Sequence, residues 1–302
     1  MKLESTQFPF VLLTVCFSGT AEGKTAQSSV MRVPPIRGHI RFWHRVLFDA
    51  DSANRIWGST AGNGGSSLVA LRLNPAGREE TRGSRLLPHV EFTPAERDEY
   101  RRLEGGSREN LRFKELKQKK AKAESQRPAL QPQGQFTLTL QRLVGCKAAD
   151  WSAAQIAVKV WLLVGCLGLR SNRAAGSIWP INPPPPQPQW VPGDLNALVQ
   201  TLRNSPPQGG LGLRWAGQLA DPSGSLSAEQ VRAIASDTRD GSPQFFGSIR
   251  PQRQPSPLKL KVVYLSGRHC LLALAQNAQT IHGALQELNG KRSWSQLRWQ
   301  NL

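Results

Sequence analysis

The sequence predicts an α+β protein, and three observations carry this prediction. Its 302 residues suffice for two small domains. Between residues 8 and 180, apolar runs and helical patterns follow the order strand, helix, strand, insertion, strand, helix, strand. A proline-rich segment at 182–193 then separates residues 1–181 from residues 194–302. The βαββαβ order is that of ferredoxin-like domains, a group that includes RNA-recognition folds.

Residues 8–17 predict the first strand, because apolar side chains occupy both of its alternating faces. A signal peptide is the alternative for an apolar run that follows Lys2, but Glu4 interrupts the basic part and no small-residue cleavage site follows. No run approaches the roughly 20 apolar residues of a membrane span. We therefore expect a cytoplasmic protein with no membrane partner. Later strands are expected at 68–73, at 136–140 and from 178.

A short helix within residues 32–58 carries a strong charge pattern. At 100° per residue, Arg37, Arg41 and Arg45 form one cationic stripe, while Trp43 lies on the apolar face. Guanidinium groups in such a row suit a phosphate backbone. An ordinary amphipathic helix with a solvated arginine face is the alternative.

Residues 78–130 form an insertion rich in charges of both signs. Thr93, Pro94 and Glu96 are typical of a helix start, with an N-cap, a proline at the first position and a glutamate at the third. We expect a charged helical insertion that projects from the core, in part disordered, with a mainly solvated surface.

The glycine-rich loop at 165–178 is the second basic feature. Gly165, Gly168 and Gly176 would let the backbone approach a ligand closely, and Arg170 and Arg173 lie between them. Such a turn can cradle phosphate, although it lacks the pattern of a P-loop. The alternative is a mobile helix end capped by glycine.

The remaining elements follow from local signals. Capping boxes are predicted at Ser152 with Gln155 and at Ser227 with Gln230. The segment at 182–193 is expected to be an extended spacer, or a polyproline ligand. Further predictions are helices near 194–203 and 279–288, a loop at 209–217, and strands at 257–265 and 269–275. Two alternating halves suggest a tandem or duplicated module.

The composition favours a polyanionic partner. Lys and Arg number 39 against 21 Asp and Glu, a formal net charge of +18. The four cysteines are far apart, so we expect reduced, buried side chains instead of a zinc site or disulfides. None of the five histidines has metal-ligand spacing, and the sequence points to no cofactor.

Several motifs together resemble those of RAMP proteins of type III CRISPR effector complexes. The run Arg-Val-Pro-Pro-Ile-Arg-Gly-His-Ile-Arg-Phe-Trp-His-Arg-Val-Leu at 32–47 is most similar to the first RAMP subunit of the Cmr (type III-B) complex. The loop at 165–178 resembles the glycine-rich loop of the same superfamily. Ile-Trp-Gly-Ser at 56–59 and Ser-Pro-Leu at 256–258 match two further steps of the family pattern.

The resemblance implies two ferredoxin-like domains and a noncatalytic RNA-binding subunit. Its partners would be CRISPR RNA near the 3′ part, target single-stranded RNA and other RAMP subunits, which cut the target. We expect the helix and loop arginines to meet on one side of the sheet, with later basic residues extending the track. The expected RNA contacts are Arg37, Gly38, Arg41, His44, Arg45, Gly165, Gly168, Arg170, Ser171, Arg173, Gly176, Arg250, Arg253, Lys259 and Lys261.

Other functions remain open at this point. A metal-independent endoribonuclease that processes CRISPR RNA could use His44 beside the three arginines as a general acid or base. Asp49 or Asp51 could be an acidic catalytic residue, although a helix end with a turn is the simpler interpretation. A basic structural protein held at a membrane or scaffold is a third class.

Overall fold

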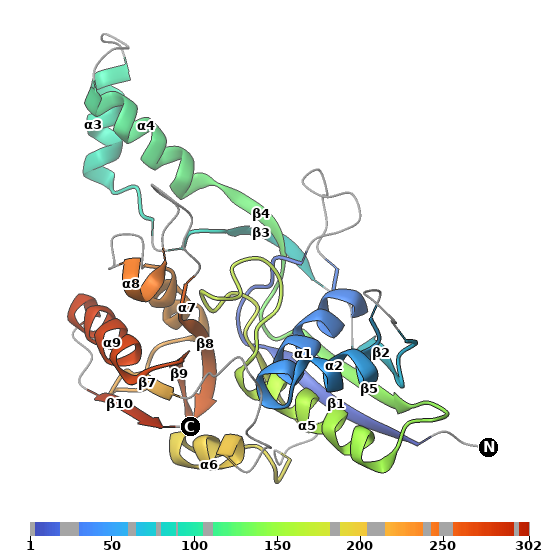
Figure 1. Ribbon diagram of the computed structural model, residues 1–302. Helices are drawn as coiled ribbons and strands as arrows, with labels where there is room; N and C mark the ends of the chain where they lie inside the picture. Colours follow the sequence, from blue (N-terminus) through green and yellow to red (C-terminus); the bar gives the residue numbers. More distant parts are fainter. Residues whose placement is uncertain are drawn as a thin grey trace.

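The computed structural model confirms an α+β protein (Figure 1). It describes residues 4–18, 30–59, 65–76, 80–88, 90–104, 111–181, 188–203, 215–237, 243–247, 256–292 and 296–301. Within these ranges, two four-stranded antiparallel sheets and a two-stranded ribbon are formed. The helices pack on the sheets, and an arm of two helices projects from the body (Figure 1).

The first sheet has the strand order β2-β5-β1-β6. Its neighbouring strands are antiparallel, and β1 lies between β5 and β6. The element order expected for residues 8–180 is confirmed, with one helix added after the first. The elements are β1 (Ser5–Leu12), α1 (Val33–Leu47), α2 (Ala50–Trp57), β2 (Val69–Pro75), β5 (Gln135–Arg142), α5 (Ala148–Val164) and β6 (Ile178–Pro180).

The first strand is shorter than predicted but is covered on both faces, as expected. Phe10 and Leu12 are fully buried on one face, and Val11 and Leu13 are buried on the other. Residues 13–17 continue beyond β1 and pair with the glycine-rich loop and with Leu130. The apolar run therefore has two parts. Its first part belongs to the regular strand β1, and residues 13–17 pair with the loop and with Leu130 outside the sheet.

One helix was not predicted, and the start of another is wrong. Residues 50–57 form α2, and Asp49 begins it by accepting a hydrogen bond of 2.6 Å from the Ser52 amide. The helix-end interpretation of Asp49 is thus confirmed. Helix α5 begins at Ala148, four residues before the predicted cap. Two alanines favour this early start, and Gln155 instead donates to Thr6 Oγ1 at 2.8 Å.

The insertion is helical, as expected, and the described part has a small core of its own. It comprises β3 (Thr81–Arg85), α3 (Pro94–Glu104), α4 (Leu111–Glu124) and β4 (Gln126–Leu130). The predicted cap is present: Thr93 Oγ1 accepts from the Glu96 amide at 3.2 Å, and Glu96 Oε2 accepts from the Thr93 amide at 3.1 Å. The buried side chains of the arm are Val90, Phe92, Tyr100, Leu116 and Ala123.

The second sheet repeats the topology of the first. Its order is β10-β7-β9-β8, so its first strand again lies between its third and fourth. The predicted strands and helices are confirmed, but β7, α8 and β10 were not predicted. The elements are α6 (Leu195–Arg203), β7 (Trp215–Ala220), α7 (Ala228–Ser236), α8 (Pro243–Phe246), β8 (Lys259–Leu265), β9 (Arg268–Ala275), α9 (Ala278–Arg292) and β10 (Gln296–Asn301).

Local sequence explains one confirmed and one missed element of this half. The capping box of Ser227 and Gln230 starts α7 as predicted. Strand β7 follows a glycine-rich stretch and contains Gly217 and a buried Gln218, which obscure a strand pattern. The Gln218 amide is satisfied inside the core by Cys270 Sγ at 3.0 Å.

The proline-rich segment is not an extended spacer where it is described. Residues 188–193 form a turn in which the Val191 amide donates to Pro188 O at 2.9 Å. Lys159 Nζ of α5 lies 5.6 Å from the centre of the Trp190 ring. Trp190 therefore packs on the first half, while Gly193 O accepts from the Ser266 amide of the second half at 2.7 Å. Residues 182–187 lie outside the described ranges.

Three further expectations concern chemistry. All four cysteines are buried, as predicted, and none forms a disulfide. Among the described residues, no cluster of three His, Cys, Asp or Glu side chains has the arrangement of a metal site. No helix in the described ranges is long and apolar enough to cross a bilayer.

Candidate nucleic-acid interface

The glycine-rich loop joins the two sheets. On one side, the Gly176 amide donates to Val15 O at 2.8 Å. On the other side, the Ala174 amide donates to Leu260 O at 3.1 Å, and Ser177 Oγ accepts from the Val262 amide at 2.9 Å. Residues 165–177 thus lie between the first half and β8, as Figure 1 shows.

The glycines of this loop serve the packing of the chain itself, which corrects their expected role toward a ligand. Gly168 and Gly176 have φ of 74° and 65°. A Cβ on Gly176 would collide with the Leu167 carbonyl, and one on Gly165 would collide with Trp161. Gly165 and Gly176 are buried. Because these glycines lack a side chain, residues 165–177 pack closely between the two halves, at a junction that we call the seam. The backbone of Gly165 and Gly176 is therefore not exposed to RNA.

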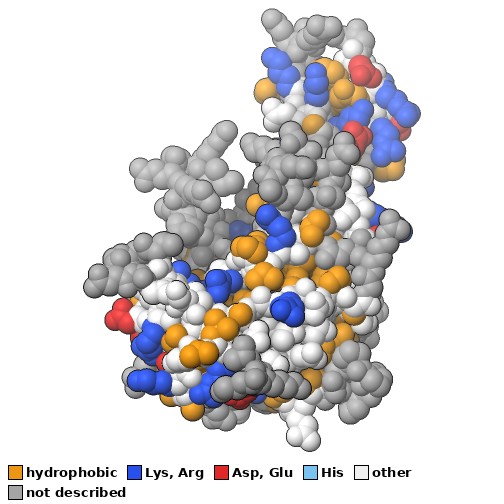
Figure 2. Space-filling view, turned by 90° about the vertical axis from the view of Figure 1, so that its right-hand side faces the viewer, with side chains coloured by type: hydrophobic (Ala, Val, Ile, Leu, Met, Phe, Trp, Pro, Cys, Tyr) orange, Lys and Arg blue, Asp and Glu red, His pale blue; other side chains and the backbone are white. Residues whose placement is uncertain are grey.

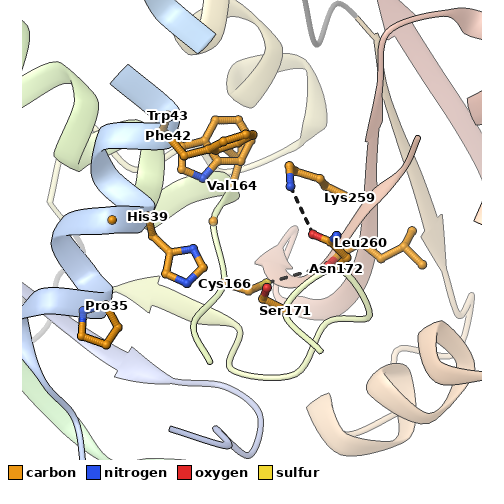
Figure 3. A pocket seen from close by; sticks show the side chains of 12 residues that line it. Pro35, His39, Phe42, Trp43, Val164, Cys166, Ser171, Asn172, Lys259 and Leu260 are labelled. Atoms are coloured by element: carbon orange, nitrogen blue, oxygen red, sulfur yellow. Dashed lines mark hydrogen bonds between the residues drawn. The ribbon is translucent and has the colours of Figure 1, made fainter. Parts of the chain in front are cut away.

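A pocket of about 320 Å³ lies where α1, the loop and β8 meet (Figure 3). It brings together four predicted site residues from three separate stretches of the sequence: Gly38, Gly165, Ser171 and Lys259. Gly38 is exposed and has open space beside its Cα. The lining residues are Pro35, Gly38, His39, Phe42, Trp43, Val164, Gly165, Cys166, Ser171, Asn172, Lys259 and Leu260.

The pocket is basic and aromatic. Lys259 Nζ lies 4.5 Å from the centre of the Phe42 ring and donates to Asn172 Oδ1 at 3.1 Å. Burial lowers the pKa of His39, and the nearby Lys259 lowers it further. Burial also lowers the pKa of Lys259. No Asp or Glu is among the described residues that line the pocket.

The arginine stripe of α1 does not face this pocket. Arg37 donates to Val69 O of β2 at 3.3 Å, and Arg41 donates to Asn54 Oδ1 of α2. Arg45 is exposed. On the face shown in Figure 2, the Lys and Arg side chains of the body are scattered among apolar ones. The expectation that the stripe meets the loop arginines is therefore wrong, because α1 presents its other edge to the loop.

Arg170 and Arg173 form a separate basic cluster beside the second half. Arg173 donates to Phe246 O, and its guanidinium lies 5.3 Å from the centre of the Phe246 ring. Burial and the neighbouring Arg170 lower the pKa of Arg173 to about 10. Burial and Arg232 lower the pKa of Arg170. Like charges are thus held close together, an arrangement that an anion would stabilise.

Two predicted contacts are wrong because their side chains are buried. His44 has no exposed surface, its Nε2 lies 3.0 Å from Ser52 Oγ, and its ring stacks on Phe48 at 4.7 Å. Burial is the main reason that its pKa falls to about 4. His44 lies about 100° around the helix from Arg45 and so faces α2. Trp43 is a core residue, as predicted.

Lys261 is the second such residue. It is 2% exposed, and Nζ donates to Leu162 O near the end of α5 at 2.6 Å. It therefore stabilises a helix end inside the protein and cannot contact RNA. Arg250 and Arg253 lie outside the described residues.

The buried Lys261 predicts a pH-dependent stability. Burial lowers its pKa to about 7, whereas an unfolded lysine titrates near about 10.4. Between these values the unfolded chain binds more protons, so the free energy of unfolding should rise with pH. Urea unfolding at pH 7 and 9 should show this rise as a difference between the wild type and Lys261→Met. A difference that stays constant with pH would contradict the assignment.

Sequence reasoning missed three residues of the pocket: His39, Phe42 and Asn172. Gly38 and Phe42 lie four residues apart on one helix face, which is a signal for a shared surface. Asn172 lies between the two loop arginines. The arginine pattern did not indicate these neighbours, because charge alone does not show which edge of a helix faces a loop.

The two sheets and the junction between them form a fold that is similar to solved structures of type III-B Cmr proteins. The crystal structure of Cmr1 from Pyrococcus furiosus in its apo form is similar, with a TM-score of 0.54 and 15% identity, over 90% of this chain and 88% of that one. A chain of the type III-B Cmr-beta complex bound to cognate target RNA is also similar, with a TM-score of 0.50 and 12% identity, over 96% and 99%.

A third similar structure is the Cmr-beta complex bound to cognate target RNA and AMPPnP in the presence of single-stranded DNA. It has a TM-score of 0.51 and 12% identity. These likenesses confirm the resemblance to Cmr-type RAMP proteins at the level of the fold. No protein-family model and no curated protein matches the sequence.

Proposed function

We propose that this chain is a noncatalytic RNA-binding subunit of a Cmr-like type III-B CRISPR effector complex. It binds CRISPR RNA near its 3′ part and helps to capture target RNA. Its protein partners are other RAMP subunits, and its place of action is the cytoplasm. The nuclease activity belongs to those other subunits.

The observation that carries this proposal is the pocket at the seam. The segments 32–47 and 165–178 are more than one hundred residues apart in sequence, yet both line it, although their arginines lie outside the pocket. Lys259 adds an ammonium group from the second half. Basic and aromatic side chains in a cleft suit single-stranded RNA. Phosphate contacts carry no sequence information, which suits a guide whose sequence varies.

The repeated sheet order supports the domain assignment. We assign residues 1–181 and 194–302 to two ferredoxin-like domains, with the charged insertion at 78–130 in the first. In each half, the first strand is followed by two helices and lies in the interior of its sheet. Gly58 and Gly247 both have positive φ and follow the second helix after the first strand of their half, which favours a duplicated module.

A processing endoribonuclease is the second candidate, and one observation favours it. His39 lines the pocket close to Lys259, and burial lowers the pKa of both groups. An imidazole and an amine of this kind could act as general base and acid. The residue first considered for this role, His44, is buried away from the pocket.

One experiment tests both candidates. The purified chain is titrated with a 3′-labelled single-stranded repeat RNA in EDTA; anisotropy reports binding, and a denaturing gel reports cutting. We expect saturable binding that resists excess duplex DNA, with the RNA intact. Cutting that disappears in His39→Ala would favour the endoribonuclease. Equal competition by duplex DNA would contradict a specific RNA-binding function.

A further inference from the structure

We propose that the pocket between α1 and the loop at 165–178 holds one unpaired base of the bound RNA. The base stacks on Phe42, and Lys259 contacts an adjacent phosphate. This inference rests on the proposed RNA-binding function and adds a defined subsite to it. The subsite consists of Phe42, His39, Ser171, Asn172 and Lys259 (Figure 3).

The ring of Phe42 forms an aromatic wall of the pocket and is held in place by Trp43. Phe42 is partly buried, and its ring meets Trp43 edge to face, with centroids 5.4 Å apart and an interplanar angle of 84°. Trp43 is buried and anchors this pair in the core. A fixed ring bordering an open cavity can stack one base, which is how aromatic side chains bind single-stranded RNA.

The size of the pocket limits what it can take. Its volume of about 320 Å³ lies at the lower end of the range for small-ligand sites. This is room for one planar base, and it is too small for a base pair with its two backbones. Since bases within a duplex are stacked and paired, the occupant must come from an unpaired stretch of RNA.

Polar groups lie around the aromatic wall. His39 comes from α1, and Ser171 and Asn172 come from the loop on the opposite side. Because burial and Lys259 lower the pKa of His39, its neutral ring offers one donor and one acceptor near pH 7. A hydroxyl and an amide add further donors and acceptors. The edges of a base carry hydrogen-bond donors and acceptors, and these side chains can bond to both.

Lys259 covers the stacking surface while the pocket is empty. Its ammonium lies 4.5 Å from the Phe42 ring centre, where a cation gains from the ring quadrupole. The amide oxygen of Asn172 holds it there at 3.1 Å. A base that stacks on Phe42 displaces this ammonium toward the cleft, where the phosphate next to the base becomes its partner. One residue thus closes the empty pocket and binds the RNA backbone.

An abasic scan tests this subsite. A single abasic residue is moved along a labelled single-stranded RNA, and each affinity for the wild-type chain is measured by anisotropy. We expect one position at which affinity falls by about 5- to 100-fold, the range for the loss of one stacked base. In Phe42→Ala the intact RNA should bind as weakly as that abasic RNA, and the profile should become flat. Phe42→Tyr should restore the position effect.

Tyr264→Ala is the matched control. Tyr264 is an exposed aromatic residue on the same strand as Lys259, five residues further along, or about 17 Å away. Its removal should leave the profile unchanged. A flat profile in the wild type with normal RNA affinity would overturn the base pocket and leave the proposed function standing. A chain that binds no RNA at all would overturn the proposed function itself.

Discussion

Replacing Gly176 with alanine lowers the free energy of unfolding by about 3 kcal/mol or more, the sum of two penalties. The first is a φ of 65°, which an L-residue adopts at a cost. The second is steric, because the new Cβ would meet the backbone carbonyl of Leu167. The Gly176 amide and carbonyl bond to Val15 and Leu167, so neither can move freely. Urea unfolding of the purified variant measures the loss.

Gly267→Ala separates the two penalties. Gly267 has a φ of 74° but nothing within 4 Å of its would-be Cβ. Its substitution should therefore cost only about 1–2 kcal/mol, the price of the left-handed backbone. Equal losses in the two variants would show that the seam at Gly176 is looser than described.

Lys259→Glu lowers the affinity for single-stranded RNA by about 10- to 100-fold, since it replaces a charge-assisted phosphate contact by a repulsion in a half-buried site. Lys147→Glu is the control, because it makes the same change in net charge at an exposed position. Lys147 precedes α5, whose 17 residues separate it from the pocket by about 26 Å. Anisotropy titrations at one salt concentration compare the two variants.

The salt dependence of binding adds an independent check. If Lys259 releases one counterion from a phosphate, Lys259→Met should make the slope of log affinity against log salt shallower by about 0.7. The slope of Lys147→Met should match that of the wild type. A large affinity loss in both glutamate variants, with no change of slope in Lys259→Met, would mean that net charge, and not the pocket, governs binding.

The sequence predicted well what local patterns control. Helix α1 has a clear 3.6-residue period, and the capping boxes at Thr93 and Ser227 lie where the structure has them. The alternation of apolar residues gave most strands of both halves. Strand β7 was not predicted, because Gly217 and Gln218 interrupt the apolar alternation. Its pairing with β9 and β10 in the second sheet determines its conformation.

The residues of the site were harder to predict from the sequence, because packing between distant segments determines which side chains line the pocket. A row of arginines shows which residues share a helix face but not which edge of the helix meets the loop. The pairing of the seam with Val15 and Leu260 turns His39 and Phe42 toward the loop, and leaves Arg37 and Arg41 to β2 and α2. Lys261 lies two residues after Lys259, on the same face of β8, but its Nζ reaches Leu162 O inside the core, a contact that no local pattern predicts.

The most direct test of the central claim is ultraviolet crosslinking of bound single-stranded RNA followed by mass spectrometry of the peptides. We expect crosslinks in three stretches that meet at the pocket, 35–43, 165–173 and 256–260, with Phe42 the strongest site. Lys259→Glu should weaken all three together. Crosslinks confined to the charged arm at 80–130, with RNA fully bound, would contradict it.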